Sequence, residues 1–283
     1  MKCGIDIGGT NIKFGIFNKD RKPYLFKIKT PKENIVESIV EALKSKVDIT
    51  MIEGYTVAIP GVMENGVVIY APNTNIVGVR LKEELERELG NTNLIVDNDA
   101  NIQALAESKV SGLENMLLLT IGTGLGGGII LNNKLHNHNG FAGEVGHIKV
   151  YFGPTARKCG CGKYGCAEAY VSTKNIVKEY NEVYNANINA KELFDLAINN
   201  DTVALKSVNE CARLLAVTIS NIVCVLGIKN VRITGGMSNA GEFFLEKVRY
   251  YYKRFALPNM EDVKIEIAEL KDNAGVFAAK YLI

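Results

Sequence analysis

The stretch that decides the fold covers residues 143–168 and reads GEVGHIKVYFGPTARKCGCGKYGCAE. Eleven residues separate His147 from Cys159, one separates Cys159 from Cys161, and four separate Cys161 from Cys166. Three thiolates and one imidazole are ligands that zinc prefers, and four protein ligands complete a tetrahedral site. The stretch therefore predicts a structural zinc that does not activate water.

Two carboxylates, Glu144 and Glu168, flank this ligand set without belonging to it. A small zinc knuckle without chemistry is the alternative interpretation. The flanking carboxylates, together with glycine-rich loops upstream, favour a site that binds a ligand.

Composition excludes several classes of protein. A chain of 283 residues suits one large or two modest domains. The net charge of +2 provides no electrostatic reason to expect nucleic acid or a membrane as partner. We expect no apolar run close to the length that crosses a bilayer, and charge appears too early, at Lys2 and Asp6, for a signal peptide. These features predict a cytoplasmic protein, in which Cys3, Cys211 and Cys224 are inert core residues.

The first glycine-rich loop lies near the N-terminus. Apolar runs at 2–7 and 12–17 predict two strands of a hairpin, whose tip is formed by Gly8, Gly9, Thr10 and Asn11. Backbone N–H groups at such a tip can cradle phosphate. Asp6, just before the tip, is placed to hold magnesium through water. An ordinary hairpin turn is the alternative interpretation.

A second glycine-rich loop repeats the first. Strands are predicted at 116–121 and 129–131, joined by Gly122, Thr123, Gly124 and four further residues. Segments Ile5–Phe17 and Leu119–Leu131 lie 114 residues apart and share the order strand, glycine turn, strand. This correspondence suggests two halves of one unit, each with its own phosphate loop.

Two junctions between a strand and a helix carry further candidates. Asp99 follows the predicted strand 94–96 and precedes a helix, so it is either a base in a binding cleft or merely a helix cap. Gly235 and Gly236 separate strand 231–234 from a helix near 240–255. They either let a nucleotide approach the backbone or allow helix and strand to pack closely.

One helix start is also predicted. Thr30, Pro31 and Glu33 have the pattern of a capping box with proline at the first helical position. An amphipathic helix with apolar residues from Ile35 to Leu43 follows.

The stretch 143–168 resembles the signature of the ROK family of sugar kinases, Gly-Glu-x-Gly-His followed by Cys-x-Cys-Gly-x-x-Gly-Cys-x-Glu. The two facing glycine loops with a strand-end carboxylate are similar to the actin-like ATPase superfamily. The resemblance implies that His147 and the three cysteines hold zinc, that Asp99 is the base, and that Gly235 and Gly236 meet the adenosine. It further implies a sugar site formed by Gly61, Asn73 (with Asn75 as a near neighbour), Asn98, Asp99, Glu144, His147 and Glu168.

The predicted fold is therefore α/β, a two-domain actin-like ATPase (ribonuclease H-like) fold with an interdomain cleft. We place the domains at 1–112 and 113–283, with the final helix 272–283 packing back toward the first. The resemblance implies ATP-dependent hexose phosphorylation with Mg²⁺, most simply of glucose. We also expect a homodimer. Fructose, mannose, allose or N-acetylmannosamine are alternative substrates.

Two other classes of function stay open. A ROK-type transcriptional repressor requires an N-terminal helix-turn-helix, for which a hairpin starting at residue 2 leaves no room. A sugar-binding protein without catalysis is disfavoured by Asp99 together with intact phosphate loops.

Overall fold

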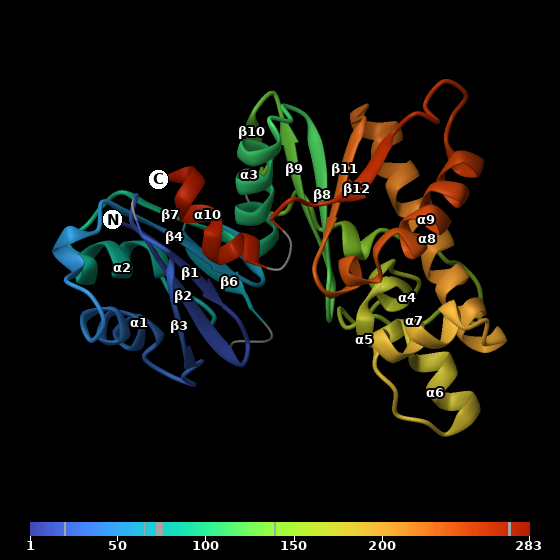
Figure 1. Ribbon diagram of the computed structural model, residues 1–283, viewed down its shortest axis with the longest axis horizontal. Coiled ribbons are helices and arrows are strands. Elements are labelled where there is room, and N and C mark those ends of the chain that lie inside the picture. Colours follow the sequence, from blue (N-terminus) through green and yellow to red (C-terminus); the bar gives the residue numbers. More distant parts are fainter. Residues whose placement is uncertain (20, 65, 72–75, 139, 271–272) are drawn as a thin grey trace. The chain divides into compact units, whose positions relative to one another are not determined.

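The computed structural model describes residues 1–283 except 20, 65, 72–75, 139 and 271–272 (Figure 1). The chain forms two compact units. The N-terminal unit comprises Met1–Glu114, Gly128–Ala142 and Asn273–Ile283, and the C-terminal unit comprises Asn115–Gly127 and Gly143–Asp272.

A five-stranded sheet of order β3-β2-β1-β4-β7 organises the N-terminal unit. Its strands are β1 (Lys2–Ile7), β2 (Asn11–Phe17), β3 (Tyr24–Lys29), β4 (Gly54–Ile59) and β7 (Leu94–Asn98). β2 pairs antiparallel with β1 and β3, whereas β1, β4 and β7 are parallel. The predicted hairpin is confirmed, with Ile7 paired to Ile12 next to the glycine tip.

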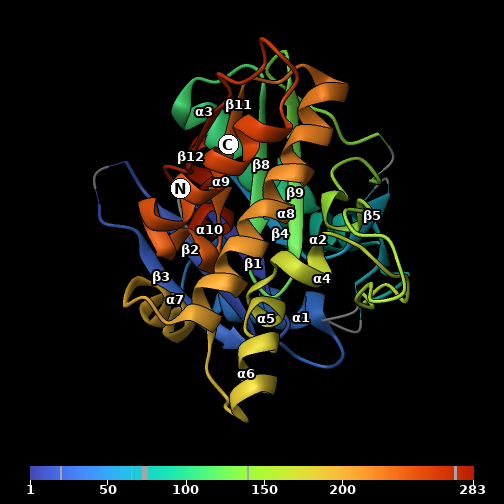
Figure 2. The same cartoon turned by 90° about the vertical axis from the view of Figure 1, so that its right-hand side faces the viewer.

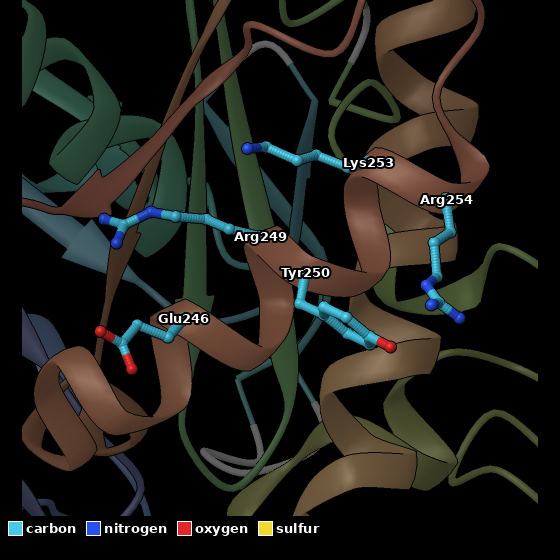
Figure 3. A pocket seen from close by; sticks show the side chains of 5 residues that line it. All are labelled: Glu246, Arg249, Tyr250, Lys253 and Arg254. Carbon is cyan, nitrogen blue, oxygen red and sulfur yellow. The ribbon is translucent and has the colours of Figure 1, made fainter.

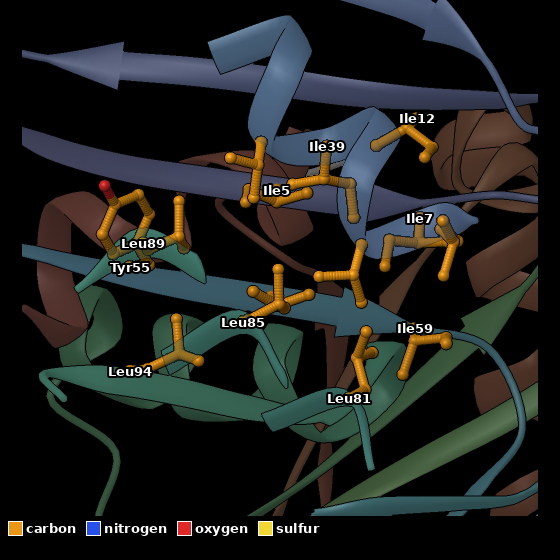
Figure 4. Close-up of a cluster of buried hydrophobic side chains, with 14 of the residues drawn as sticks. Ile5, Ile7, Ile12, Ile39, Tyr55, Ile59, Leu81, Leu85, Leu89 and Leu94 are labelled. Carbon is orange, nitrogen blue, oxygen red and sulfur yellow. The ribbon is translucent and has the colours of Figure 1, made fainter. Parts of the chain in front are cut away.

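Helices cover both faces of this sheet. They are α1 (Ile35–Lys44), α2 (Leu81–Leu89), α3 (Asp99–Ser111) and α10 (Ala274–Leu282), with the short helix η1 (Ile49–Met51) and the hairpin β5 (Val62–Glu64) and β6 (Val67–Tyr70) between them. The apolar sides of α1 and α2 bury a core against one face, shown in Figure 4 with Ile5, Ile39 and Leu85. On the other face α10 packs on β1 and α3 (Figure 1). A Cβ at Gly4 would lie 1.8 Å from the carbonyl oxygen of Val276, so only glycine allows α10 this close.

The predicted capping box at Thr30 is wrong. Helix α1 begins at Ile35, after Asn34 in the left-handed conformation. Thr30 instead extends the pairing of β3, because its N–H donates to the carbonyl of Thr10 over 3.0 Å. Its hydroxyl donates to the carbonyl of Gly8 and is therefore directed at the first glycine loop.

The second sheet has the order β10-β9-β8-β11-β12. Its strands are β8 (Met116–Ile121), β9 (Leu125–Leu131), β10 (Lys134–Leu135), β11 (Asn230–Thr234) and β12 (Lys264–Ile267). β11 lies parallel to both β8 and β12. The turn between β8 and β9 carries the second glycine loop, but the predicted extent of that loop to residue 128 is wrong, because β9 begins at Leu125.

The helices of the C-terminal unit pack around one long core helix. They are η2 (Val145–His147), α4 (Glu168–Val171), α5 (Thr173–Ile176), α6 (Lys178–Tyr184), α7 (Ala190–Ile198), α8 (Thr202–Leu226), η3 (Gly236–Ala240) and α9 (Gly241–Phe255). α8 contacts α9, α7 and α4 (Figure 2).

By length and composition α8 is apolar enough to cross a membrane, so the expectation that no run approaches that length is wrong. However, 61% of its most apolar window is buried inside the structure, as in a core helix.

Candidate functional site

Four side chains of the C-terminal unit form a cluster that could hold a metal ion. The ligand atoms of His147, Cys159, Cys161 and Cys166 all lie within 4.8 Å of one another. The sulfurs of Cys161 and Cys166 are 3.7 Å apart, and Nδ1 of His147 is 3.8 Å from the sulfur of Cys159. A tetrahedron with metal–sulfur bonds of about 2.3 Å has edges of about 3.8 Å. The donor set and its spacing therefore fit zinc.

Local backbone geometry directs the sulfurs inward. Cys159 donates its N–H to the carbonyl of Lys163 over 2.8 Å, which closes a tight loop around Cys161. Gly165 has φ of +75°, and a Cβ there would lie 2.0 Å from the carbonyl oxygen of Tyr151. Lys149 donates from Nζ to the sulfur of Cys166 over 2.7 Å and so places a positive charge beside the cluster.

His147 connects the cluster to the first flanking carboxylate. Its Nδ1 faces Cys159, while its Nε2 lies 3.7 Å from Oε2 of Glu144. Burial raises the pKa of Glu144, and the nearby imidazole of His147 opposes that shift. The ring can therefore bind a metal through Nδ1 and present Nε2 to a ligand beside Glu144.

The second carboxylate connects the cluster to the second glycine loop. Oε1 of Glu168 accepts from the thiol of Cys159 over 3.4 Å, and Oε2 accepts from the N–H of Leu125 over 3.1 Å. A Cβ at Gly124 would lie 2.7 Å from Oε2 of Glu168. Glu168 and the loop are thus in direct contact, a link that the sequence did not indicate.

The second loop has free space beside the backbone of its first residue, Gly122. Apart from the neighbours of Gly122 in the chain, no described residue has an atom within 4 Å of a Cβ built on Gly122. The N–H of Gly122 donates to the carbonyl of Gly124 over 3.0 Å, and Thr123 lies between them. The carbonyl of Gly122 accepts both the N–H and the hydroxyl of Thr173, each over 2.8 Å. The turn is therefore tight, and Thr173 holds it through the carbonyl of Gly122.

The two glycines after β11, Gly235 and Gly236, differ in whether their surroundings leave space for a side chain. Gly235 has φ of +84°, and a Cβ there would lie 2.7 Å from the carbonyl oxygen of Ile121, so close packing alone excludes a side chain. A Cβ on Gly236 would make only an ordinary contact, 3.8 Å from the methyl group of Thr173. Thr173 therefore lies next to the turn at Gly122–Gly124 and next to the turn at Gly235 and Gly236.

The first loop is closed by a short turn in the N-terminal unit. The N–H of Gly8 donates to the carbonyl of Asn11 over 3.0 Å, with Gly9 and Thr10 between them. At the end of β1, burial raises the pKa of Asp6, whereas Lys13, 3.7 Å away, acts in the opposite direction.

The strand-end pair lies where β7 meets α3. Asn98 is the N-cap of α3, because its Oδ1 accepts the N–H of Ala100 over 2.8 Å. Its Nδ2 donates to the carbonyl of Gly61 over 2.7 Å. Asp99 is the first helical residue and also accepts the N–H of Ala100, at 2.8 Å. The structure thus brings Gly61, Asn98 and Asp99 together, while Asn73 and its neighbour Asn75 lie outside the described residues.

Asp97 is a residue to which sequence reasoning assigned no role. It accepts the N–H of Asn98 over 2.6 Å and the side-chain amides of Asn101 and Asn137, each over 2.9 Å. Burial raises the pKa of Asp97, and these hydrogen bonds oppose the rise. Asp97 therefore helps to hold the backbone at Asn98.

A hollow on the surface of α9 is a separate feature. It is lined by Glu246, Arg249, Tyr250, Lys253 and Arg254 (Figure 3). All five belong to α9, so this hollow contains no residue of the loops or cluster described above.

Comparison with known proteins tests the family resemblance. The chain matches the model of the ROK family over residues 2–283. It is 35% identical to a glucokinase of Halalkalibacterium halodurans, over 99% of this chain and 94% of that one. It is 31% identical to an N-acetylmannosamine kinase of Haemophilus influenzae, over 100% and 95% respectively. A ROK family glucokinase from Streptomyces griseus, solved in complex with glucose and AMPPNP, matches with a TM-score of 0.80 at 30% identity, over 98% and 97%.

These similarities cover nearly the whole chain rather than one motif. The solved ROK kinases have the two-domain actin-like ATPase fold, which confirms the predicted fold class. The signature at residues 143–168 and the match across residues 2–283 lead to the same conclusion: the chain belongs to the ROK family.

Proposed function

We propose that this chain transfers the γ-phosphoryl group of ATP to a hexose, most simply converting glucose to glucose 6-phosphate. The observation that carries the proposal is the pair Asn98 and Asp99 at the start of α3. An ionised carboxylate is stabilised at a helix N-terminus. Such a carboxylate can take the proton of an attacking hydroxyl, which is the role of the base in phosphoryl transfer.

The residues proposed to bind the sugar are Gly61, Asn73 and Asn98, together with Glu144, His147 and Glu168, which would bind its hydroxyls. The contact of Nδ1 of His147 with Cys159 supports this assignment, because it leaves Nε2 to donate to a hydroxyl next to Glu144.

The metal in this proposal is a structural zinc at His147, Cys159, Cys161 and Cys166. When bound, zinc supplies a fixed tetrahedral anchor rather than an activated water. Glu168 lies two residues after Cys166, so the same anchor restrains its backbone.

ATP with Mg²⁺ binds to the backbone of the glycine turns. Backbone N–H groups at Gly8, Gly9, Thr10 and Asn11, and at Gly122, Thr123 and Gly124, are the proposed donors to phosphate. Gly235 and Gly236 meet the adenosine. Asp6 holds Mg²⁺ through water, since magnesium is reluctant to lose its hydration shell.

N-acetylmannosamine is the alternative substrate that a specific observation favours, because a kinase for this sugar is 31% identical over the whole chain. Fructose, mannose and allose stay as further alternatives. A homodimer in the cytoplasm, without nucleic acid or membrane as partner, completes the proposal.

The test is a coupled kinase assay with purified protein, Mg²⁺-ATP and a panel of these five sugars. Phosphorylation of glucose by the wild type, and its loss in Asp99→Asn, supports the proposal. A higher kcat/KM for N-acetylmannosamine than for glucose would show that N-acetylmannosamine is the preferred substrate. The proposed mechanism would then be unchanged. Absence of ADP formation with every sugar, in a folded protein that contains zinc, would refute the kinase assignment.

A further inference from the structure

We infer that Thr30 and Thr173 are positioning residues, each of which fixes one glycine-tipped loop through the carbonyl of the loop's first glycine. The inference rests on the proposed function, since it concerns how those loops are prepared for a nucleotide. Neither threonine is among the residues that the ROK signature contains.

The first contact lies in the N-terminal unit. The hydroxyl of Thr30 donates to the carbonyl oxygen of Gly8 over 2.5 Å. The N–H of Thr30 donates to the carbonyl of Thr10 over 3.0 Å, which attaches the same residue to the far side of the turn. Thr30 follows directly after β3, so the edge of the sheet holds the loop.

The second contact repeats this arrangement in the C-terminal unit. The hydroxyl and the N–H of Thr173 both donate to the carbonyl oxygen of Gly122, each over 2.8 Å. Thr173 is the first residue of α5, directly after the short helix α4 that begins at Glu168. Gly8 and Gly122 occupy the same position in the two hairpins, so each loop has a threonine hydroxyl on the equivalent carbonyl.

The physical consequence follows from the planarity of the peptide bond. In a trans peptide the C=O of one residue and the N–H of the next point in opposite directions. Holding the carbonyl of Gly8 therefore sets the direction of the N–H of Gly9. Holding the carbonyl of Gly122 likewise sets the direction of the N–H of Thr123. These N–H groups are the donors that such a turn offers to phosphate.

Without the hydroxyls, each peptide plane at a glycine is freer to rotate, because glycine restricts φ and ψ least. A nucleotide would then have to order the loop on binding, which weakens affinity. The threonines act on the nucleotide only through the loops, so their loss should affect ATP and leave the sugar unaffected.

The experiment replaces each hydroxyl by a methyl group of similar shape, in Thr173→Val and Thr30→Val. Thr173→Ser and Thr30→Ser keep the hydroxyl and serve as rescue variants. Thr218→Val is the matched control, because the hydroxyl of Thr218 also donates to a backbone carbonyl, that of Leu214 over 2.9 Å, but inside α8. Affinity for a non-hydrolysable ATP analogue with Mg²⁺ is measured by calorimetry, and KM is measured for ATP and for glucose.

Each valine variant is expected to weaken the affinity for the ATP analogue and raise KM for ATP about fivefold, the effect of losing one hydrogen bond. KM for glucose and the zinc content should stay at the wild-type level. The serine variants should restore nucleotide affinity, and Thr218→Val should not change it.

The inference is overturned if both valine variants bind the ATP analogue like the wild type, or if KM for glucose rises as much as KM for ATP. If Thr173→Val does not fold, Thr30→Val and the two serine variants still decide the matter. A wild type that phosphorylates no sugar, while both valine variants selectively lose affinity for the ATP analogue, would refute the proposed function and support this inference.

Discussion

Alanine at Gly124 should impair the binding of both substrates, whereas alanine at Gly122 should impair only that of ATP. The two glycines lie two residues apart in one turn, and neither has positive φ, so the backbone accepts alanine at both positions. Their surroundings differ. A Cβ at Gly124 would lie 2.7 Å from Oε2 of Glu168, but a Cβ at Gly122 would have no described atom within 4 Å apart from those of its chain neighbours.

The size of the effect follows from that distance. Ordinary van der Waals contact starts at 3.4 Å, so the carboxylate of Glu168 must retreat by about 0.7 Å. Its hydrogen bond from the N–H of Leu125 is already 3.1 Å long and would be lost. A hydrogen bond to a charged group contributes about 1.5–3 kcal/mol. Even the lower figure corresponds to about tenfold in affinity, so we expect KM for glucose to rise about tenfold in Gly124→Ala.

The assay is steady-state kinetics with each substrate varied at saturating concentration of the other. Gly122→Ala should raise KM for ATP about tenfold, since its methyl group occupies the space where phosphate meets the backbone, and should leave KM for glucose unchanged. The reasoning is wrong if Gly124→Ala changes only KM for ATP, or if Gly122→Ala raises KM for glucose equally.

Three further predictions concern other parts of the site. Asp99→Asn should lower kcat by about 10²–10⁴-fold with little change in sugar affinity by calorimetry, because the amide keeps the shape and loses the base; an unchanged kcat in the folded variant would contradict the role of Asp99. Cys161→Ser should lose zinc, measured by atomic emission, and weaken sugar binding, because a hydroxyl is a poor zinc ligand and both His147 and Glu168 depend on the cluster; a folded, zinc-free variant with wild-type sugar affinity would disprove that dependence. Asp97 has a pKa raised by burial above its ordinary value of 3.8, so its ionisation opposes folding: stability is greatest below that value and falls as pH rises through the raised pKa. The thermal midpoint of the wild type relative to Asp97→Asn should therefore decrease as pH rises from about 4 to 7, and a difference that is constant with pH would show that Asp97 does not titrate in this way.

The sequence by itself determined the features that depend on neighbours along the chain. The two glycine-tipped hairpins follow from apolar runs separated by glycine, because tight turns between adjacent strands are local structures. The metal cluster follows from spacing, since the three cysteines lie within eight residues of one another and the glycines between them permit tight turns. The start of α3 near Asp99 was likewise predicted from the change from an apolar run to polar residues, although the N-cap is Asn98 and not Asp99.

Only the tertiary structure decided which side chains meet across the chain. Thr30 has the local pattern of a helix cap, yet its hydroxyl donates to Gly8, 22 residues away. Sheet pairing determines this contact, because β3 runs alongside β2 and brings Thr30 next to the turn. Glu168 reaches Leu125 across 43 residues, and Asn137 reaches Asp97 across 40. Such contacts depend on the packing of whole elements, which local propensity does not encode.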